Sequence, residues 1–379
     1  MFIKPFIGEN VTMRQNNICS ILIAILMLGL AVSVMEAGSK KRRGTAGAQE
    51  LLIPVGSRGT AMAGAYVAGI SGLEAIEWNM AGLSGMANNG QAMSSYSSWI
   101  ADIGVTSVAI ASSFGGNSVF GISLKSLDFG EIPVTTALLP DGTGEHYSPS
   151  YLTFNFLFSR KMTDRIFFGS TVKLVSESIM RETAQGMAID AGVQYKADNG
   201  FSLGASLRNL GLNMIFNGAD LEEFHTPEDT EPGTNTEPRR IFLQEFELPT
   251  TLELGISYGL NIGPAKGILA ASFLNNNFSF DEYRFGAEFL VMDMLSLRGG
   301  LSMGYDPEPY GTDGIENTTD DEDDEGGLES QSDEFIWGPT FGFGLDLSKL
   351  TGIGLSVDYA FRTAKFFDGI SWLTLTVSF

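Results

Sequence analysis

Alternation of apolar and polar residues is the dominant pattern of this chain. Between residues 251 and 260 every even position is apolar and every odd one is polar or glycine, and residues 373–379 alternate in the same way. Successive side chains of a strand point to opposite faces, so this period predicts strands with one apolar and one polar face. Fourteen such strands are expected, near residues 90–99, 104–113, 117–127, 151–160, 165–175, 187–196, 201–209, 251–260, 266–274, 282–291, 294–303, 335–347, 352–361 and 370–379.

The connections between these segments divide by length. Those after even-numbered segments are all short, whereas those after odd-numbered segments include every long one, at 128–150, 176–186, 210–250 and 304–334. An even-stranded barrel of the outer-membrane type has short turns at one end and long loops at the other. Because an open sheet edge in hydrocarbon would leave backbone groups unpaired, the sheet must close. The pattern therefore predicts an all-β fold, a fourteen-stranded antiparallel transmembrane β-barrel over 90–379. The long acidic loops are expected outside the cell, and Trp372 in an interfacial aromatic belt.

The N-terminus contains an apolar stretch of its own. Residues 21–32 are apolar or glycine without interruption, and Arg14 precedes them. This length fits a signal-peptide core and is short for a membrane helix. We expect a signal peptide over 1–37, with cleavage after Ala37 or Ala48; an uncleaved anchor helix is the alternative. The single cysteine, Cys19, lies before the apolar stretch, so the mature chain is expected to carry no thiol chemistry.

Charge narrows the range of partners. The net charge of −22 argues against nucleic-acid binding, which needs a basic surface. Residues 306–334 hold thirteen acidic side chains and no Lys or Arg, which is typical of a solvated loop. The alternative is loose capture of divalent cations, for which the candidates are Asp320, Asp321, Asp323 and Asp324. No dedicated metal site and no cofactor are expected. The two histidines fall in predicted external loops and no phosphate-binding loop is present, so an enzyme is not expected.

Residues 49–89 do not alternate and are rich in glycine and alanine. Small residues with spaced bulky ones predict short helices packed in a confined space, so we expect a helical hatch in the barrel lumen. The segment ends in Trp78-Asn79-Met80-Ala81-Gly82-Leu83. Here the chain resembles the FadL-like superfamily of outer-membrane transporters, most of all the branch with the PorV/PorQ proteins and an uncharacterised spirochaete-type family. Their hatch ends in a Trp-Asn-Pro-Ala-Gly-Leu type sequence, and Met80 replaces that proline. The hatch residues of interest are Gly59, Gly64, Trp78, Asn79, Ala81 and Gly82.

The resemblance implies transport of hydrophobic molecules, with long-chain fatty acids as the expected substrate. The alternative is a PorV-like partner in protein secretion or surface attachment, without transport; a plain diffusion porin is disfavoured because a hatch would block it. Trp78 and Asn79 are expected to pack and to cap a turn, and a ligand or gating role is the alternative. Outer-membrane lipid and the outer-membrane assembly machinery are the other expected partners. Lumen-side cations could bind a ligand carboxylate or pair with acids of the wall; they are Lys173, Arg208, Arg284 and Arg298.

Overall fold

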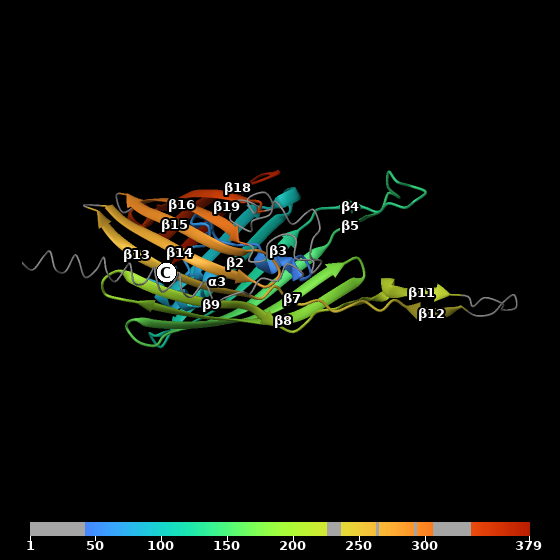
Figure 1. The fold of residues 1–379 in the computed structure, drawn as a ribbon, viewed down its shortest axis with the longest axis horizontal. Coiled ribbons are helices and arrows are strands. Elements are labelled where there is room, and N and C mark those ends of the chain that lie inside the picture. Colours follow the sequence, from blue (N-terminus) through green and yellow to red (C-terminus); the bar gives the residue numbers. More distant parts are fainter. Residues whose placement is uncertain (1–41, 226–235, 263–264, 292–293, 306–334) are drawn as a thin grey trace, which may run out of the picture. The chain divides into compact units, whose positions relative to one another are not determined.

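The computed structural model describes residues 42–225, 236–262, 265–291, 294–305 and 335–379. Fourteen long strands run through it in chain order: β1 (Gly90–Ser98), β2 (Gly104–Phe114), β3 (Ser118–Asp128), β6 (Ser150–Lys161), β7 (Ile166–Ile179), β8 (Glu182–Lys196), β9 (Phe201–Gly211), β13 (Thr251–Ile262), β14 (Ala265–Asn276), β15 (Asp281–Val291), β16 (Leu295–Tyr305), β17 (Trp337–Asp346), β18 (Gly354–Ala364) and β19 (Phe367–Ser378). Each pairs with its neighbour antiparallel, and β1 pairs with β19, so the sheet closes into a barrel (Figure 1).

All fourteen predicted strands are confirmed, and the alternation sets which side chains face the lumen. Along β2 the side chains of Val105 and Ser107 are buried, whereas Val108 and Ile110 are about half exposed on the outside. The outward apolar side chains form the surface that lipid would cover. The two ends of the barrel sequence meet directly, because Gly90 and Phe379 exchange two backbone hydrogen bonds of 2.8 and 2.9 Å.

Two details of the sequence interpretation are wrong. Residues 176–186 form no long loop, since β7 continues to Ile179 and β8 begins at Glu182, and the hairpin turns at Met180 with a φ of 53°. Polar residues on both faces of this extension hid the alternation. Trp372 does not lie in an outward aromatic belt. It is 1% exposed, and its Nε1 donates to the carbonyl oxygen of Pro54 at 3.0 Å, which places it inside the barrel.

The remaining short elements belong to the connections. β4 (Ile132–Pro133) pairs with β5 (His146–Tyr147), β11 (Glu222–His225) pairs with β12 (Glu237–Arg240), and β10 (Phe216–Gly218) adds to β8. Both ribbons extend from one end of the barrel, on the right of Figure 1. Three short helices complete the set, η4 (Ile100–Asp102), η5 (Ala219–Leu221) and α4 (Ser348–Thr351). The predicted signal peptide and the acidic segment 306–334, with its four candidate aspartates, lie outside the described residues.

Ahead of the barrel strands, four short helices form the hatch: η2 (Gln49–Leu52), α2 (Ser57–Ala61), α3 (Ala75–Trp78) and η3 (Met80–Gly85). Their side chains pack against inward side chains of the wall, as where Met80 and Leu83 of η3 join Ala109 and Leu157 in one buried cluster. The hatch therefore fills part of the lumen, as its composition predicts. Within the described residues, no helix has both the length and the apolar character needed to cross a membrane.

Candidate functional site

Asn79 fixes the hatch to the barrel wall. Its Oδ1 accepts a hydrogen bond of 3.1 Å from the backbone N–H of Ala81, which caps η3. Its amide nitrogen lies 3.0 to 3.3 Å from three carbonyl oxygens, those of Val67, Val193 and Ala205. The last two belong to β8 and β9. The side-chain cap ends the extended backbone at Asn79 and begins η3 at Met80, so the turn forms without a proline.

Trp78 occupies space that two hatch glycines leave open. The ring is 5% exposed, and a Cβ built on Gly59 would lie 2.1 Å from its Nε1. A Cβ on Gly64 would lie 2.5 Å from the same ring, and the φ of Gly64 is +80°. Gly82 likewise approaches the carbonyl oxygen of Ile70, at 2.1 Å from an added Cβ. These residues, together with the fully buried Ala81, pack the hatch closely around Trp78.

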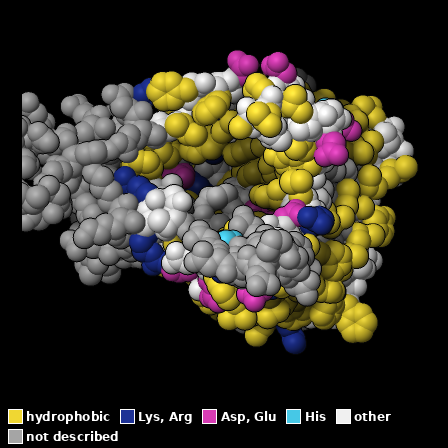
Figure 2. All heavy atoms as spheres, turned by 90° about the vertical axis from the view of Figure 1, so that its right-hand side faces the viewer, with side chains coloured by type: hydrophobic (Ala, Val, Ile, Leu, Met, Phe, Trp, Pro, Cys, Tyr) yellow, Lys and Arg dark blue, Asp and Glu magenta, His cyan; other side chains and the backbone are white. Residues whose placement is uncertain are grey.

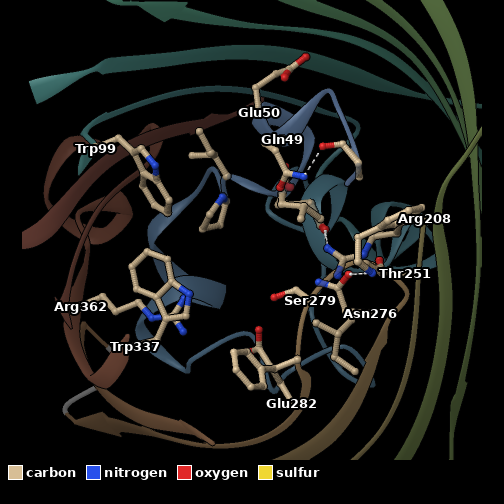
Figure 3. Close-up of a pocket in the computed structure, with 18 of the residues that line it drawn as sticks. Gln49, Glu50, Trp99, Arg208, Thr251, Asn276, Ser279, Glu282, Trp337 and Arg362 are labelled. Atoms are coloured by element: carbon tan, nitrogen blue, oxygen red, sulfur yellow. Dashed lines mark hydrogen bonds between the residues drawn. The ribbon is translucent and has the colours of Figure 1, made fainter. Parts of the chain in front are cut away.

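Two cavities lie on opposite sides of the hatch. The outer cavity, of about 630 Å³, opens at the long-loop end, where Figure 2 shows a hollow with hydrophobic side chains along its wall. The inner cavity, of about 360 Å³, lies at the short-turn end. The lining of the outer cavity is mixed, and Figure 3 shows Trp99 and Trp337 together with polar and charged side chains such as Glu50, Arg208 and Glu282. Its aromatic side chains are Trp78, Trp99, Phe129, Tyr151, Phe278, Phe280 and Trp337.

The aromatic wall of the outer cavity is held together by ring contacts. Trp99 lies 5.3 Å from Trp337 and 6.0 Å from Trp372, measured between ring centroids. On another part of the wall, Phe129 and Tyr151 meet edge to face at 4.8 Å. Such contacts add stabilisation beyond the burial of the rings. The cavity therefore has an ordered aromatic part beside its charged side chains, and that part fits a hydrophobic ligand.

The predicted cations Arg208 and Arg284 line this outer cavity, and both have acidic partners. The guanidinium of Arg208 lies 3.2 Å from Glu253 and donates to the carbonyl oxygen of Glu77 at 2.5 Å. That of Arg284 lies 2.9 Å from Glu282 and 3.5 Å from Glu253. Their charges are thus compensated within the protein.

The other two predicted cations lie elsewhere. Arg298 borders the inner cavity and contacts Glu288 at 2.6 Å and Asp358 at 2.5 Å. Glu288 also accepts two hydrogen bonds from Arg58 of the hatch, so this chain of charges joins hatch and wall. Lys173 lies in the wall, lines neither cavity, and contacts Asp190 at 2.7 Å. The structure therefore does not bring the four cations together, and it pairs each of them.

A fifth cation, Arg362 of β18, lines the outer cavity and was missed in the sequence. It is 8% exposed, and its guanidinium carbon lies 4.3 Å from the ring centroid of Trp337. It donates to the hydroxyl of Ser302 at 2.8 Å, while its Nε has no hydrogen-bond partner. Among the described residues no carboxylate forms an ion pair with it. Figure 3 shows it beside Trp337, across the cavity from Arg208.

Glu50 of the hatch is a buried acid without a cation of its own. It is 2% exposed, no described donor bonds to its carboxylate, and the carboxyl group of Glu177 adjoins it. Burial raises the pKa of Glu50 to about 8, and the charge of Glu177 adds to the increase, whereas that of Lys125 opposes it. Lys125 itself donates to the carbonyl oxygen of Ile53 at 2.8 Å. Hatch and wall thus meet at a buried carboxyl group that holds its proton more tightly than an exposed glutamate does.

Comparison with solved structures finds barrels of the same architecture. The Ralstonia pickettii toluene transporter TbuX has a TM-score of 0.51 at 14% identity, over 86% of this chain and 97% of that one. The CymD monoaromatic hydrocarbon channel has a TM-score of 0.50 at 12% identity, over 86% and 98%. A FadL homologue from Pseudomonas aeruginosa has 0.49 at 12%, over 86% and 99%. Neither a scan against models of protein families nor a comparison with curated proteins finds a match.

The likeness to TbuX and CymD establishes the fold, a closed fourteen-stranded barrel of the kind seen in these channels. The structural neighbours are FadL-family hydrocarbon channels, in keeping with the wider resemblance in the sequence. None of the three structures is a PorV or PorQ protein, so that branch of the resemblance stays a prediction.

Proposed function

We propose that this chain is an outer-membrane channel that takes up hydrophobic molecules, with long-chain fatty acids as the expected substrate. The observation that carries the proposal is the outer cavity. Its volume of about 630 Å³ lies in the range of small-molecule binding sites, and its aromatic side chains would shield the apolar part of a ligand from water. Because the cavity opens toward the long loops, a ligand would enter from the side that we place outside the cell.

The apolar outer surface of the barrel supports the proposal that the protein lies in a membrane. Its outward side chains are large and apolar on most strands, and a soluble protein rarely exposes so continuous an apolar surface. Examples at 40% exposure or more include Ile110, Phe120, Phe156, Leu174, Ile189, Leu269, Phe285, Leu301, Phe341 and Leu375. Hydrocarbon is the medium that such a surface requires, so outer-membrane lipid is the expected surrounding.

Ligand binding tests the proposal directly. All four tryptophans lie in or beside the outer cavity, since three line it and Trp372 contacts Trp99. Ligand entry should therefore change the intrinsic fluorescence of the full-length protein in lipid nanodiscs. Dodecanoate should give a saturable change, and glucose should give none. Toluene belongs in the series because the similar structures include a toluene transporter and a monoaromatic hydrocarbon channel.

The outcome also separates the two candidate functions. Saturable binding of any hydrophobic ligand supports a transporter, and uptake of that ligand by cells that express the protein would complete the case. If none of the hydrophobic ligands binds, transport is contradicted, and a partner role in secretion or surface attachment becomes the better interpretation.

A further inference from the structure

Glu50 and Glu177 form a pair of acids where the hatch begins. Glu50 belongs to η2 and is 2% exposed, and Glu177 belongs to β7 and is 4% exposed. Their carboxyl groups lie within hydrogen-bonding reach of each other. Figure 3 shows Glu50 at the edge of the outer cavity, with its carboxyl group directed away from the centre. The pair therefore joins the hatch to the wall beside that cavity.

The contact between the two acids requires a proton. Glu177 accepts a hydrogen bond from the backbone N–H of Ala48, whereas neither side-chain oxygen of Glu50 has a donor among the described residues. Two ionised carboxylates are acceptors only, so they form a hydrogen bond only when one of them carries a proton. Burial raises the pKa of Glu50 to about 8, so Glu50 is the acid that holds the proton and donates it to Glu177.

The other neighbours of η2 offer little compensation for a second negative charge. Lys125 of β3 is the cation that acts on Glu50, but its Nζ donates to the carbonyl oxygen of Ile53 at 2.8 Å. It also lies 3.8 Å from Glu77. Tyr151 of β6 is a phenol that contributes no positive charge. The side chains of the buried cluster that holds Leu51 of η2 are apolar; they are Ala48, Leu51, Val175, Ala184, Ala188, Met214 and Leu248.

Glu74 of the hatch is also buried, but its carboxylate has donors of its own. It accepts hydrogen bonds from the backbone N–H groups of Ser57, Arg58 and Gly59, at 3.0, 3.2 and 3.4 Å. Burial raises the pKa of Glu74 to about 7, and the ionised form keeps all three donors. Loss of its proton thus strengthens contacts within the hatch, because hydrogen bonds to a charged acceptor are stronger. Loss of the Glu50 proton instead removes the contact with the wall.

We propose that Glu50 and Glu177 form a pH-dependent latch, which holds η2 against β7 while they share a proton and releases it when both are ionised. Because Gln49, Glu50 and Leu52 line the outer cavity, release of η2 would change the shape of that cavity. The pKa of Glu50 is about 8 in the closed state and near the ordinary 4.5 in the open one, so opening should increase across this interval and level off above it. The inference goes beyond the proposed function, since the latch does not depend on the ligand.

Thiol labelling at Leu51 measures the release of η2. Leu51 is 3% exposed, and Cys19→Ser removes the only natural thiol. Leu51→Cys in this background is reacted with a maleimide between pH 5 and 9, on the full-length protein in nanodiscs. Its rate is divided at each pH by that of Leu51→Cys with Glu50→Gln, which cancels the ionisation of the thiol. This ratio should rise at least about tenfold between pH 5 and 8, where the limit is about tenfold per pH unit. Glu177→Gln should serve equally well as the reference, because its amide donates where the proton did.

Three results would overturn the inference. The first is equal labelling with Glu50 and with Glu50→Gln at every pH. The second is rapid labelling at pH 5 in Glu50→Gln or Glu177→Gln, since an amide donor should hold η2 closed. The third is an equal pH-dependent rise at Leu83→Cys, a fully buried position in η3 that serves as the matched control. Should Leu51→Cys not fold, Ala188→Cys reports from the wall side of the same apolar cluster.

Discussion

The two cavities differ in how their charges are satisfied. The inner cavity is bordered by a chain of alternating charges in which Arg58 and Arg298 share Glu288, and Arg298 also reaches Asp358. The outer cavity combines aromatic and charged side chains, and its Arg362 forms no ion pair with a described residue. Arg298 at the inner cavity is therefore fully paired, whereas Arg362 at the outer cavity has no ion pair among the described residues. The hatch thus separates two cavities whose cations differ in pairing.

The largest effect is expected from removing that separation. A chain lacking residues 53–86 keeps every strand of the barrel, so it should still insert and close. Its lumen should fill with water, and its conductance in planar bilayers should exceed that of the full chain by about an order of magnitude. Unchanged conductance would show that the hatch is not the barrier between the cavities. Heat-modified gel mobility provides the control for a folded barrel.

Paired and unpaired cations should respond oppositely to mutation. Glu253 is fully buried and contacts both Arg208 and Arg284, so Glu253→Gln leaves two buried cations with less compensation. We expect a loss of about 3–5 kcal/mol in the free energy of unfolding. Arg362→Met without ligand should cost nothing or stabilise the barrel, because it removes a buried charge that has no ion pair among the described residues. Urea unfolding in lipid vesicles measures both. A large loss in Arg362→Met would mean that an internal acid already pairs with it.

Stability should also depend on pH through Glu50. Its pKa in the folded protein is about 8 instead of the ordinary 4.5, so the folded state binds this proton more tightly than the unfolded state. The contribution to stability is complete below pH 4.5 and is lost as the pH rises to 8, by at most about 1.4 kcal/mol per pH unit. Glu50→Gln mimics the protonated acid and should flatten this part of the curve. An identical pH dependence in both proteins would contradict the assignment.

The smallest effect concerns the packing of Trp78. Gly59→Ala should cost about 1–3 kcal/mol, because the added methyl group would meet the indole ring at 2.1 Å. Gly259→Ala is the matched control, since the nearest atom to its added Cβ lies at 3.7 Å. Thermal unfolding of the two variants compares them. Equal midpoints would show that the hatch can shift away from the ring at no cost.

The strands were predictable because the membrane imposes one period on them. Apolar side chains must face lipid on every strand, so the fourteen segments and the closure of the barrel follow from alternation. The alternation is lost where that constraint ends. β7 continues to Ile179 and β8 begins at Glu182, and both extensions have polar residues on both faces. Trp372 is a different case, since its position in the alternation of β19 is that of an inward side chain and the belt prediction disregarded it.

The candidate site was predictable only in part. Lumen-facing cations can be recognised because they fall on the polar positions of the alternation, and four were identified in this way. Arg362 has the same parity as Asp358 and Ala360, but the predicted strand ended at residue 361, so it was not considered. Pairing depends on residues far apart in the chain, as with Arg298 and Asp358, 60 positions apart. The residue that lacks a partner is therefore visible only once the strands are assembled.

The attachment of Asn79 has a consequence for how related sequences should vary. Its amide is held by the carbonyl oxygens of Val193 and Ala205, and every residue type at those positions supplies the same carbonyl. Substitutions at these two positions of β8 and β9 should therefore be tolerated, and the main restriction should be that the new side chain suits a lipid environment. The amide has no such substitute, because aspartate would lose the donor and glutamine would move it. Among homologues we expect an invariant asparagine facing strand positions that drift, so that one side of this contact evolves while the other does not.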